Sequence, residues 1–350
     1  MSHKYLKKRI DHIDLRKVST VSDMLTAYKG SSFQSRNLAR CVDVFSAMLK
    51  DKDRPTIFLG LAGAMVPAGM KKIVSLVVAE NMVDVIVSTG ANMYHDVAEA
   101  LGGYHYIGSP DVDDRELYES GVDRIYDVFA DEKKYREIDN EIMGLADEVV
   151  KTEPVISSRR FLCLLGKYID QSGSKGDREG SIVWNCWKNN VPIFVPALND
   201  SSIGLGITQH YIRHLQKGLK PLIIDEIRDN YEIFSIKKAA KKTGVIYVGG
   251  GVPKNYIQQT AYLEDLFGLP DSGHDYGFQL TTDRPEWGGL SGATFKEGFS
   301  WGKERPSGMY VTCYCDATIS LPLVVKAVLE ISSDDLKRRM RLNFNLDQST

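Results

Sequence analysis

The stretch VIYVGGG, residues 245–251, decides the fold. Four β-branched or aromatic residues predict a short buried strand, and three glycines follow it at once. The same arrangement, a short apolar run that ends near glycine or proline and is followed by a helical pattern, recurs along the chain. The other runs are Thr56–Gly60, Val83–Thr89, Ile193–Pro196 and Pro221–Asp225. This repetition predicts an α/β fold, with a Rossmann-like, doubly wound, mostly parallel sheet and helices on both faces.

The chain is expected to divide into an N-terminal helical arm and one large domain. Apolar residues repeat at helical spacing toward the end of the first 50 residues, at Leu38, Val42, Phe45 and Leu49. We therefore expect residues 1–50 to form an arm and a helix packed on the core, and residues 51–350 to form a single α/β domain. The Gly/Ser-rich segment 170–180 is interpreted as an exposed loop within that domain.

Composition argues against several classes of protein. With 350 residues, 43% of them hydrophobic, the chain can bury a large core. A net charge of -2 argues against a dedicated nucleic-acid binder. The charged N-terminus lacks the apolar segment of a signal peptide, no apolar run is long enough to span a membrane, and five scattered cysteines argue against a disulfide framework. We expect a cytoplasmic protein without a membrane or nucleic-acid partner.

Ligands of doubly wound sheets bind at the carboxyl ends of the strands. Glycines there let the backbone approach a phosphate closely, and the helix N-termini that follow favour anions. The predicted strand ends with small or polar residues are 60–64, 88–92, 196–202 and 249–251. The triple glycine is the strongest candidate, whereas GLAGAM, residues 60–65, fits a tight turn without a ligand equally well. Asp200 could hold a ribose hydroxyl or a substrate amine, or it could cap a helix.

The histidines and cysteines are weaker candidates for metal-binding, redox or catalytic roles. His210 and His214 are spaced i,i+4 on a predicted helix, but no further ligand pattern accompanies them, so a surface helix is favoured and no metal is expected. Cys313 and Cys315 lie in an alternating, strand-like run and are interpreted as small apolar residues. His95 lies near a predicted ligand-binding strand end, where a core or surface role is slightly favoured over a functional one.

The stretch SGATFKEGFSWGKERP, residues 291–306, contains a lysine with unusual neighbours. Lys303 follows Trp301 by two residues, and an aromatic, water-poor wall lowers the pKa of a lysine and leaves more of it neutral and nucleophilic. Glu297 could bind a cationic substrate, and the Trp301 ring could hold an alkylammonium. Taken alone, a surface lysine after a packed tryptophan is the simpler interpretation; together the three residues suggest an amine site.

These blocks, in this order, resemble the deoxyhypusine synthase family. The resemblance covers almost the whole chain, and the chain looks like a divergent, bacterial-type member. The matching blocks are FQSRNLARCVDVFSAML, TIFLG, NMVDVIVSTGAN, PALNDSSIG, VIYVGGGVPK, SGATFKEGFSWGK and VTCYCDAT. The WGK block is the most specific of them, and Lys303 falls on the family's catalytic lysine.

The resemblance implies an NAD-dependent aminobutyl transfer. In the family, NAD oxidises spermidine, the butylamine part passes to the lysine as an enzyme-bound imine, an acceptor amine displaces the lysine, and the same NADH reduces the new imine. The acceptor is a lysine of a translation factor in deoxyhypusine synthase, and putrescine in the homospermidine synthases that arose from it. The resemblance also implies a homotetramer with sites at subunit interfaces.

The resemblance assigns roles to individual positions of the large domain. The positions that contact NAD in the family correspond here to Thr89, Gly90, Ala91, Asp200, Gly249, Gly251, Thr282, Ser291 and Asp316. The positions of the polyamine site correspond to Ser202, Glu297 and Trp301, and Gln259 replaces a nearby amide contact.

The chain departs from the family pattern at several site positions. The replacements are Asn255 for a catalytic histidine, Leu205 and Leu290 for two aspartates that hold the polyamine, Tyr94 and His95 for two glutamates, and Gly63 and Ala64 for a polar pair. His95 or Tyr256 could act as the base instead. Asp283, Glu286 and Trp287 could replace some of the lost contacts.

Three functions remain open at this point. The first is an NAD-dependent aminoalkyl transferase that works through the Lys303 imine, with a protein lysine or putrescine as acceptor. The second is an NAD-dependent amine oxidoreductase with net redox change, which would accumulate NADH. The third is a catalytically silent binding protein, in which a Lys303→Ala variant would change no activity.

Overall fold

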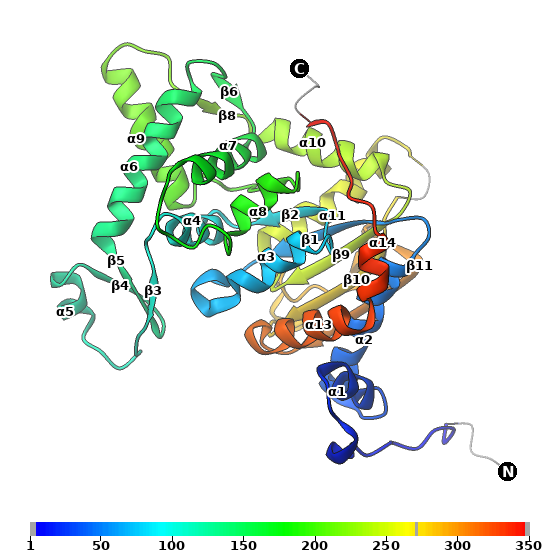
Figure 1. Cartoon of the computed structure of the whole chain (residues 1–350). Helices are drawn as coiled ribbons and strands as arrows, with labels where there is room; N and C mark the ends of the chain where they lie inside the picture. Colours follow the sequence, from blue (N-terminus) through cyan, green and yellow to red (C-terminus); the bar gives the residue numbers. More distant parts are fainter. Residues whose placement is uncertain (1–4, 270–271, 347–350) are drawn as a thin grey trace.

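The computed structural model describes residues 5–269 and 272–346 (Figure 1). Its centre is a six-stranded sheet in the order β11-β10-β9-β1-β2-β7, and every neighbouring pair is parallel. The strands are β1 (Thr56–Leu61), β2 (Val85–Ser88), β7 (Ile193–Phe194), β9 (Thr243–Val248), β10 (His274–Thr281) and β11 (Glu304–Tyr314). The predicted doubly wound, mostly parallel α/β fold is confirmed.

The strand order reverses next to β1. From β1 the chain moves outward through β2 to β7, and then returns to the other side of β1 to form β9, β10 and β11. Phe58 of β1 is therefore flanked by Val85 of β2 and by Val245 of β9. Such a reversal leaves a crevice at the carboxyl ends of the two strands that flank it, here β1 and β9.

Alternating side chains divide the core between the two faces of the sheet. Ile57 and Leu59 belong to the larger buried cluster, and Phe58 between them belongs to the smaller one. The larger cluster includes residues of α2 (Phe33–Lys50), α3 (Lys71–Ala79), α4 (Gly90–Ala100), α7 (Ser158–Gln171), α8 (Ile182–Lys188) and α13 (Ala317–Ile331). The smaller cluster includes residues of α10 (Glu226–Ala239), α11 (Gly251–Leu266) and α12 (Phe295–Ser300). Helices therefore cover both faces of the sheet, as predicted.

The N-terminal segment begins with η1 (Leu15–Lys17) and α1 (Val21–Tyr28), and α2 follows. Phe45 and Met48 of α2 are fully buried in the larger core cluster, as the helical spacing of apolar residues suggested. α1 lies against α13, where the Ser22 N–H donates to Glu330 Oε2 at 2.8 Å. The boundary at residue 50 stays a prediction.

Two small sheets lie outside the central one. The antiparallel order β3-β5-β4 joins β3 (His105–Ile107), β5 (Val128–Asp131) and β4 (Val122–Ile125), and this segment projects at the left of Figure 1 together with α5 (Asp114–Glu119). These strands were not predicted, because three or four residues are too few to show an alternating pattern of apolar residues. β8 (Ile223–Ile224), within the predicted strand 221–225, pairs only with β6 (Val155–Ile156) and not with the central sheet.

The remaining elements complete the helical layers. They are η2 (Val66–Met70), α6 (Glu132–Val149), α9 (Ser202–Gln216), η3 (Pro285–Trp287) and α14 (Ser333–Arg338). The predicted loop at 170–180 is confirmed between α7 and α8. Among the described residues, no helix has the length and apolarity needed to cross a membrane.

A buried ion cluster ties the C-terminal segment to the sheet. Asp84, which precedes β2, accepts two hydrogen bonds from Arg54 at 2.7 Å each and one from Arg339 at 2.8 Å. The backbone N–H of Ile57 adds a bond of 2.9 Å to the same carboxylate. Both Asp84 and Arg339 are almost completely buried, so each charge depends on the other.

We predict that Asp84→Ala lowers the free energy of unfolding by about 3–5 kcal/mol, because two buried or half-buried guanidinium groups lose their counter-charge. Urea unfolding followed by circular dichroism measures the change. The control is Asp43→Ala, which breaks the exposed pair with Lys29 and should cost less than about 1 kcal/mol. Equal effects of the two substitutions would contradict this account.

Candidate active site

Three loops meet where the strand order reverses. Gly249 and Gly251, directly after β9, have φ values of 70° and 54°, a region that favours glycine. A Cβ at Gly249 would lie 3.3 Å from that of Ala62, which follows β1. On the other side, the Asn92 side chain donates to the Gly63 carbonyl at 2.6 Å and accepts from the Met65 N–H at 3.0 Å. The loops after β9, β1 and β2 are thus neighbours at one edge.

The triple-glycine loop also touches the segment that carries Ser291. A Cβ at Gly250 would lie 2.4 Å from the Ser291 Cα, so only glycine permits this approach. The Gly251 N–H donates to Ser291 Oγ at 2.9 Å, and Gln279 Nε2 donates to the carbonyls of Gly249 and Ser291 at 2.8 and 2.7 Å. Gly250 is the N-cap of α11 and has no side chain to cap it. The Gly251 N–H is thus already used and Pro253 has none, so among the described residues the N–H groups of Gly250 and Val252 are left to bind an anion such as a phosphate.

The second predicted cofactor segment approaches the loop that carries Asp200. Thr89 caps α4, and a Cβ at Gly90 would lie 2.3 Å from Ser201 Oγ. Ser201 caps α9 by accepting from the Gly204 N–H at 3.3 Å, so the alternative that Asp200 is the helix cap is wrong. Asp200 and Ala91 are exposed beside these caps. Their side chains are therefore free for a ligand at this edge.

The last two predicted cofactor positions follow β10 and β11. Thr282 is exposed directly after β10, and Asp316 caps α13 by accepting from the Thr318 N–H at 2.8 Å. Because all six strands are parallel, the ends of β2, β7, β9, β10 and β11 share one edge. The nine predicted cofactor positions therefore lie along this edge or, for Ser291, against it.

The side chain of Lys303 reaches toward the same edge from the amino end of the strands. It precedes β11, so its backbone lies at the amino end of the strands, but its Nζ donates to Asn255 Oδ1 at 3.2 Å. Asn255 lies four residues into α11, about 6 Å along the helix from Gly251. The side chain is 7% exposed overall, and Nζ lies 4.9 Å from the centre of the Trp301 ring. The amine therefore lies about one helical turn from the glycine loop, against an aromatic face.

Burial lowers the pKa of Lys303, and the neighbouring Glu304 opposes that shift. Its hydrogen-bond acceptor is an amide, which cannot neutralise an ammonium as a carboxylate would. Among the described residues no carboxylate lies within ion-pair distance of Lys303 Nζ, so desolvation favours the neutral amine, which is the nucleophilic form. The environment proposed for this lysine from its sequence neighbours is thus present.

The other predicted substrate residues lie on two separate parts of the fold: three on or next to α11 and α12, and one on α9. Glu297 completes a capping box on α12 by accepting from the Thr294 N–H at 2.7 Å. Trp301 is 38% exposed, so one part of its ring remains open to a ligand. Gln259 is exposed one turn after Asn255 on α11. Ser202 instead lies at the start of α9, in a groove of about 500 Å³ lined by acidic residues of α6.

His95 lies in a polar network between α4, β3 and α6. Its Nδ1 is 3.1 Å from the Tyr135 hydroxyl and 3.0 Å from His105 Nε2, and His105 Nδ1 is 2.6 Å from Glu99 Oε1. Burial, with a smaller effect of His105, lowers the pKa of His95 to about 4. The ring is therefore neutral at pH 7. None of its contacts includes Lys303 or Asn255 within this chain.

The alternative base, Tyr256, is unsuited to that role in this chain. Burial raises the pKa of its phenol, and its nearest charges are Asp229 and Glu232 of α10. It therefore stays protonated at neutral pH. Of the remaining replaced positions, Leu205, Leu290 and Ala64 are exposed, and Tyr94 is buried.

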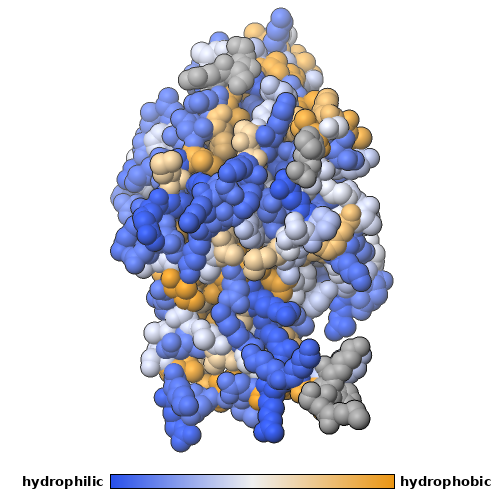
Figure 2. Space-filling model, turned by 90° about the vertical axis from the view of Figure 1, so that its right-hand side faces the viewer, coloured by the Kyte–Doolittle hydropathy of each residue, from blue (hydrophilic) through white to orange (hydrophobic). Residues whose placement is uncertain are grey.

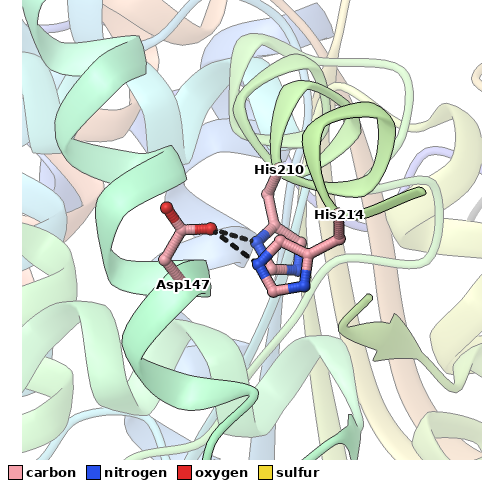
Figure 3. A group of neighbouring side chains, drawn as sticks. All are labelled: Asp147, His210 and His214. Atoms are coloured by element: carbon pink, nitrogen blue, oxygen red, sulfur yellow. Dashed lines mark hydrogen bonds and ion pairs between the residues drawn. The ribbon is translucent and has the colours of Figure 1, made fainter. Parts of the chain in front are cut away.

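The sequence favoured a surface helix for His210 and His214. That prediction is wrong for His210, which is buried, whereas His214 is partly buried. Figure 3 shows both rings of α9 turned toward Asp147 of α6. His210 is fully buried, and its Nδ1 lies 2.6 Å from Asp147 Oδ1. His214 Nε2 lies 3.2 Å from the same oxygen. The sequence offered no signal for Asp147, which lies 63 residues earlier.

The hydrogen bonds of this cluster argue against a metal site. His210 Nε2 accepts from the Leu222 N–H at 2.8 Å, so the ring proton is on Nδ1 and points at Asp147. A histidine that binds a metal normally keeps a proton on its other nitrogen, which is impossible here. That leaves His214 Nε2 and one carboxylate, too few ligands for a closed zinc site. The contacts of Asp147 with the two histidines instead hold α6 against α9.

We predict that zinc leaves the melting temperature unchanged, whereas Asp147→Ala lowers the free energy of unfolding by about 1–3 kcal/mol, because the buried His210 N–H loses its acceptor. Thermal scans with and without zinc, and urea unfolding, measure the two effects. Glu137→Ala, at an exposed position of α6, is the control. A zinc-dependent rise in melting temperature that Asp147→Ala abolishes would establish a metal site instead.

Comparisons with known proteins find relatives that match most of the chain. The family model for deoxyhypusine synthase matches residues 23–328. A Methanosarcina acetivorans protein named probable deoxyhypusine synthase 2 is 50% identical over 326 residues, 93% of this chain and 91% of that one. A Chlorobaculum tepidum protein named deoxyhypusine synthase-like is 39% identical over 323 residues, 91% of this chain and 89% of that one.

Solved structures share the fold at low sequence identity. A crystal structure of an Entamoeba histolytica protein described as a deoxyhypusine synthase aligns with a TM-score of 0.59 and 18% identity, over 96% of this chain and 99% of that one. AgrE, solved in a ternary complex with ornithine and NAD+, aligns with a TM-score of 0.52 and 12% identity, over 87% of this chain and 34% of that one. These similarities support the fold.

Proposed function

Because the chain belongs to the deoxyhypusine synthase family and is therefore a transferase, we propose that it performs an NAD-dependent aminoalkyl transfer through an imine on Lys303. The donor is a spermidine-like polyamine, and the acceptor is a protein lysine or putrescine. The observation that carries this proposal is the buried Lys303 amine, which lies on the Trp301 ring and has an amide as its acceptor.

The residues at the carboxyl edge fit NAD. In this proposal the N–H groups of Gly250 and Val252, at the uncapped start of α11, donate to the pyrophosphate. In this proposal Asp200, exposed beside the start of α9, accepts from a ribose hydroxyl. NAD supplies the hydride acceptor of such a reaction and later its hydride donor, so the net redox change is zero.

Lys303 performs the covalent step in this proposal. Its neutral amine attacks the oxidised donor carbon, and the leaving amine takes the departing proton, so that the aminoalkyl group becomes linked to Nζ as an imine. Attack by the acceptor amine reverses this linkage and frees Lys303. Trp301 excludes water from one side of the amine and offers its face to the cationic chain.

The proposal leaves two acceptors, a protein lysine or a small amine such as putrescine, and each corresponds to a different activity. The relatives' names favour a protein lysine. The loss of two aspartates at Leu205 and Leu290 and of the histidine at Asn255 favours a changed, small-molecule pocket. Each charged hydrogen bond lost to a dication costs roughly 1.5–3 kcal/mol, so unchanged substrate recognition is not expected.

Product analysis tests the proposal. We predict that the protein, incubated with NAD, spermidine and putrescine, forms 1,3-diaminopropane, with homospermidine when putrescine is the acceptor. Lys303→Ala should lower this rate by about a thousandfold or more, since the covalent intermediate is lost. Chromatography of the amines and absorbance of NADH measure the outcome. Steady accumulation of NADH would indicate an oxidoreductase, and no turnover with any acceptor would contradict the transfer.

We also propose that the protein is a homo-oligomer, a tetramer as the family resemblance suggests. An exposed apolar row runs along α9 at spacings of three and four residues, the pattern of a helix-packing seam. Its apolar members are Leu205, Ile212 and Leu215, and the exposed Thr208 lies between the first two. The face drawn in Figure 2 is by contrast mostly hydrophilic, with only limited hydrophobic patches. A second copy is the simplest occupant of the α9 row.

We predict that replacing Ile212 and Leu215 with glutamate together reduces the native mass toward that of the 39.2 kDa monomer, because two charges would be buried in the contact. Size-exclusion chromatography with light scattering measures the mass. Tyr118→Glu, at an exposed residue of α5, is the control and should leave it unchanged. A monomeric wild-type protein at micromolar concentration would contradict the assembly.

A further inference from the structure

A buried carboxyl lies beside Lys303. Glu304 is 3% exposed, and its Oε1 accepts from Gln258 Nε2 at 2.6 Å. Its Oε2 is also buried and has no hydrogen-bond partner among the described residues. Lys303 bonds to Asn255, three residues before Gln258 on α11. Because residues three apart share a helix face, the Lys303 amine and the Glu304 carboxyl lie near one another along α11.

The fold leaves room for this carboxyl at a glycine. A Cβ at Gly298 of α12 would lie 1.6 Å from Glu304 Oε2, so any larger residue would displace it. The Lys303 N–H donates to the Gly298 carbonyl at 3.0 Å. Gly298 therefore fixes both the backbone that carries Lys303 and the carboxyl of Glu304.

Several charged or titratable groups surround Glu304. Lys254 of α11 is buried and donates to Gln279 Oε1 at 2.9 Å and to the Ala293 carbonyl. The charge of Glu304 also acts on the phenols of Tyr247 (β9) and Tyr310 (β11), whose pKa it raises. His274, its register partner on β10, directs its ring to Thr243 instead. The exposed Glu297 acts on Lys254 from α12.

This environment places the titration of two groups near neutral pH. Burial raises the pKa of Glu304 to about 7, against the effect of its bond to Gln258 and of the two lysines. Burial likewise lowers the pKa of Lys254 to about 8. An ionised Glu304 raises the pKa of Lys303, which burial lowers. The charge on Glu304 therefore changes near neutral pH, where Lys303 must lose its proton to act as a nucleophile.

We propose that Glu304 is a positioning residue that sets the charge of Lys303, a task that the amide of Asn255 cannot perform. This inference rests on the proposed transfer through Lys303. An ionised Glu304 holds Lys303 as an ammonium. Once Glu304 is protonated, that attraction is lost, the ammonium releases its proton to solvent more readily, and the neutral amine can form the imine.

Glu304→Gln tests this role, because it keeps the shape and the bond from Gln258 but removes the charge. Competitive labelling of lysines with an acylating reagent over a pH series, read by mass spectrometry, reports the neutral fraction of Lys303 against the exposed Lys296. We expect labelling of Lys303 at neutral pH to rise roughly threefold or more, with its midpoint moved to lower pH. The pH profile of the transfer should move in the same direction.

Two further variants keep the test decisive. Gly298→Ala retains the charge but displaces the carboxyl, and should move the Lys303 midpoint in the same direction even if Glu304→Gln fails to fold. Asp265→Asn, which removes an exposed carboxylate from α11, should leave it unchanged. An unchanged midpoint in both Glu304→Gln and Gly298→Ala would overturn the inference. Labelling needs neither NAD nor polyamine, so its result is separate from failure of the proposed transfer.

Discussion

The reversal of strand order between β1 and β9 is the constraint on which the rest of the structure depends. It gathers the loops after β9, β1 and β2 at one edge, and glycines at positions 249–251 allow them to come within van der Waals contact. Gln279 bonds this edge to the Ser291 segment, and Lys254 bonds to Gln279 in turn. Polar contacts therefore link the glycine loop to Lys254, whose charge acts on the buried carboxyl of Glu304.

Desolvation gives Lys303 its chemical character. Most lysines of the chain lie in water or against a carboxylate, where the ammonium is the stable form. Lys303 is buried against Trp301 and an amide, and its nearest negative charge is a carboxyl that burial also makes reluctant to ionise. Both effects favour a neutral amine, and α11 holds that amine about one turn below the glycine loop.

Much of the fold and part of the site could be predicted from sequence because both depend on local patterns. VIYVGGG indicates a buried strand and a glycine loop, and WGK places the lysine beside an aromatic ring. Contacts between distant segments leave no such pattern. Asp147, which binds His210, and Gln258, which binds Glu304, could be found only once α6, α9, α11 and β11 were placed in space. The strands of residues 105–131 escaped prediction because three or four residues show no period.

In the proposed transfer, Lys303 forms a covalent imine with an aminoalkyl group. The most direct measurement is reduction by borohydride after incubation with NAD and spermidine, followed by digestion and mass spectrometry. We predict the added mass of one butylamine group on Lys303 alone, and none when NAD is omitted. An adduct on another lysine, or no adduct while diaminopropane is still produced, would contradict the account.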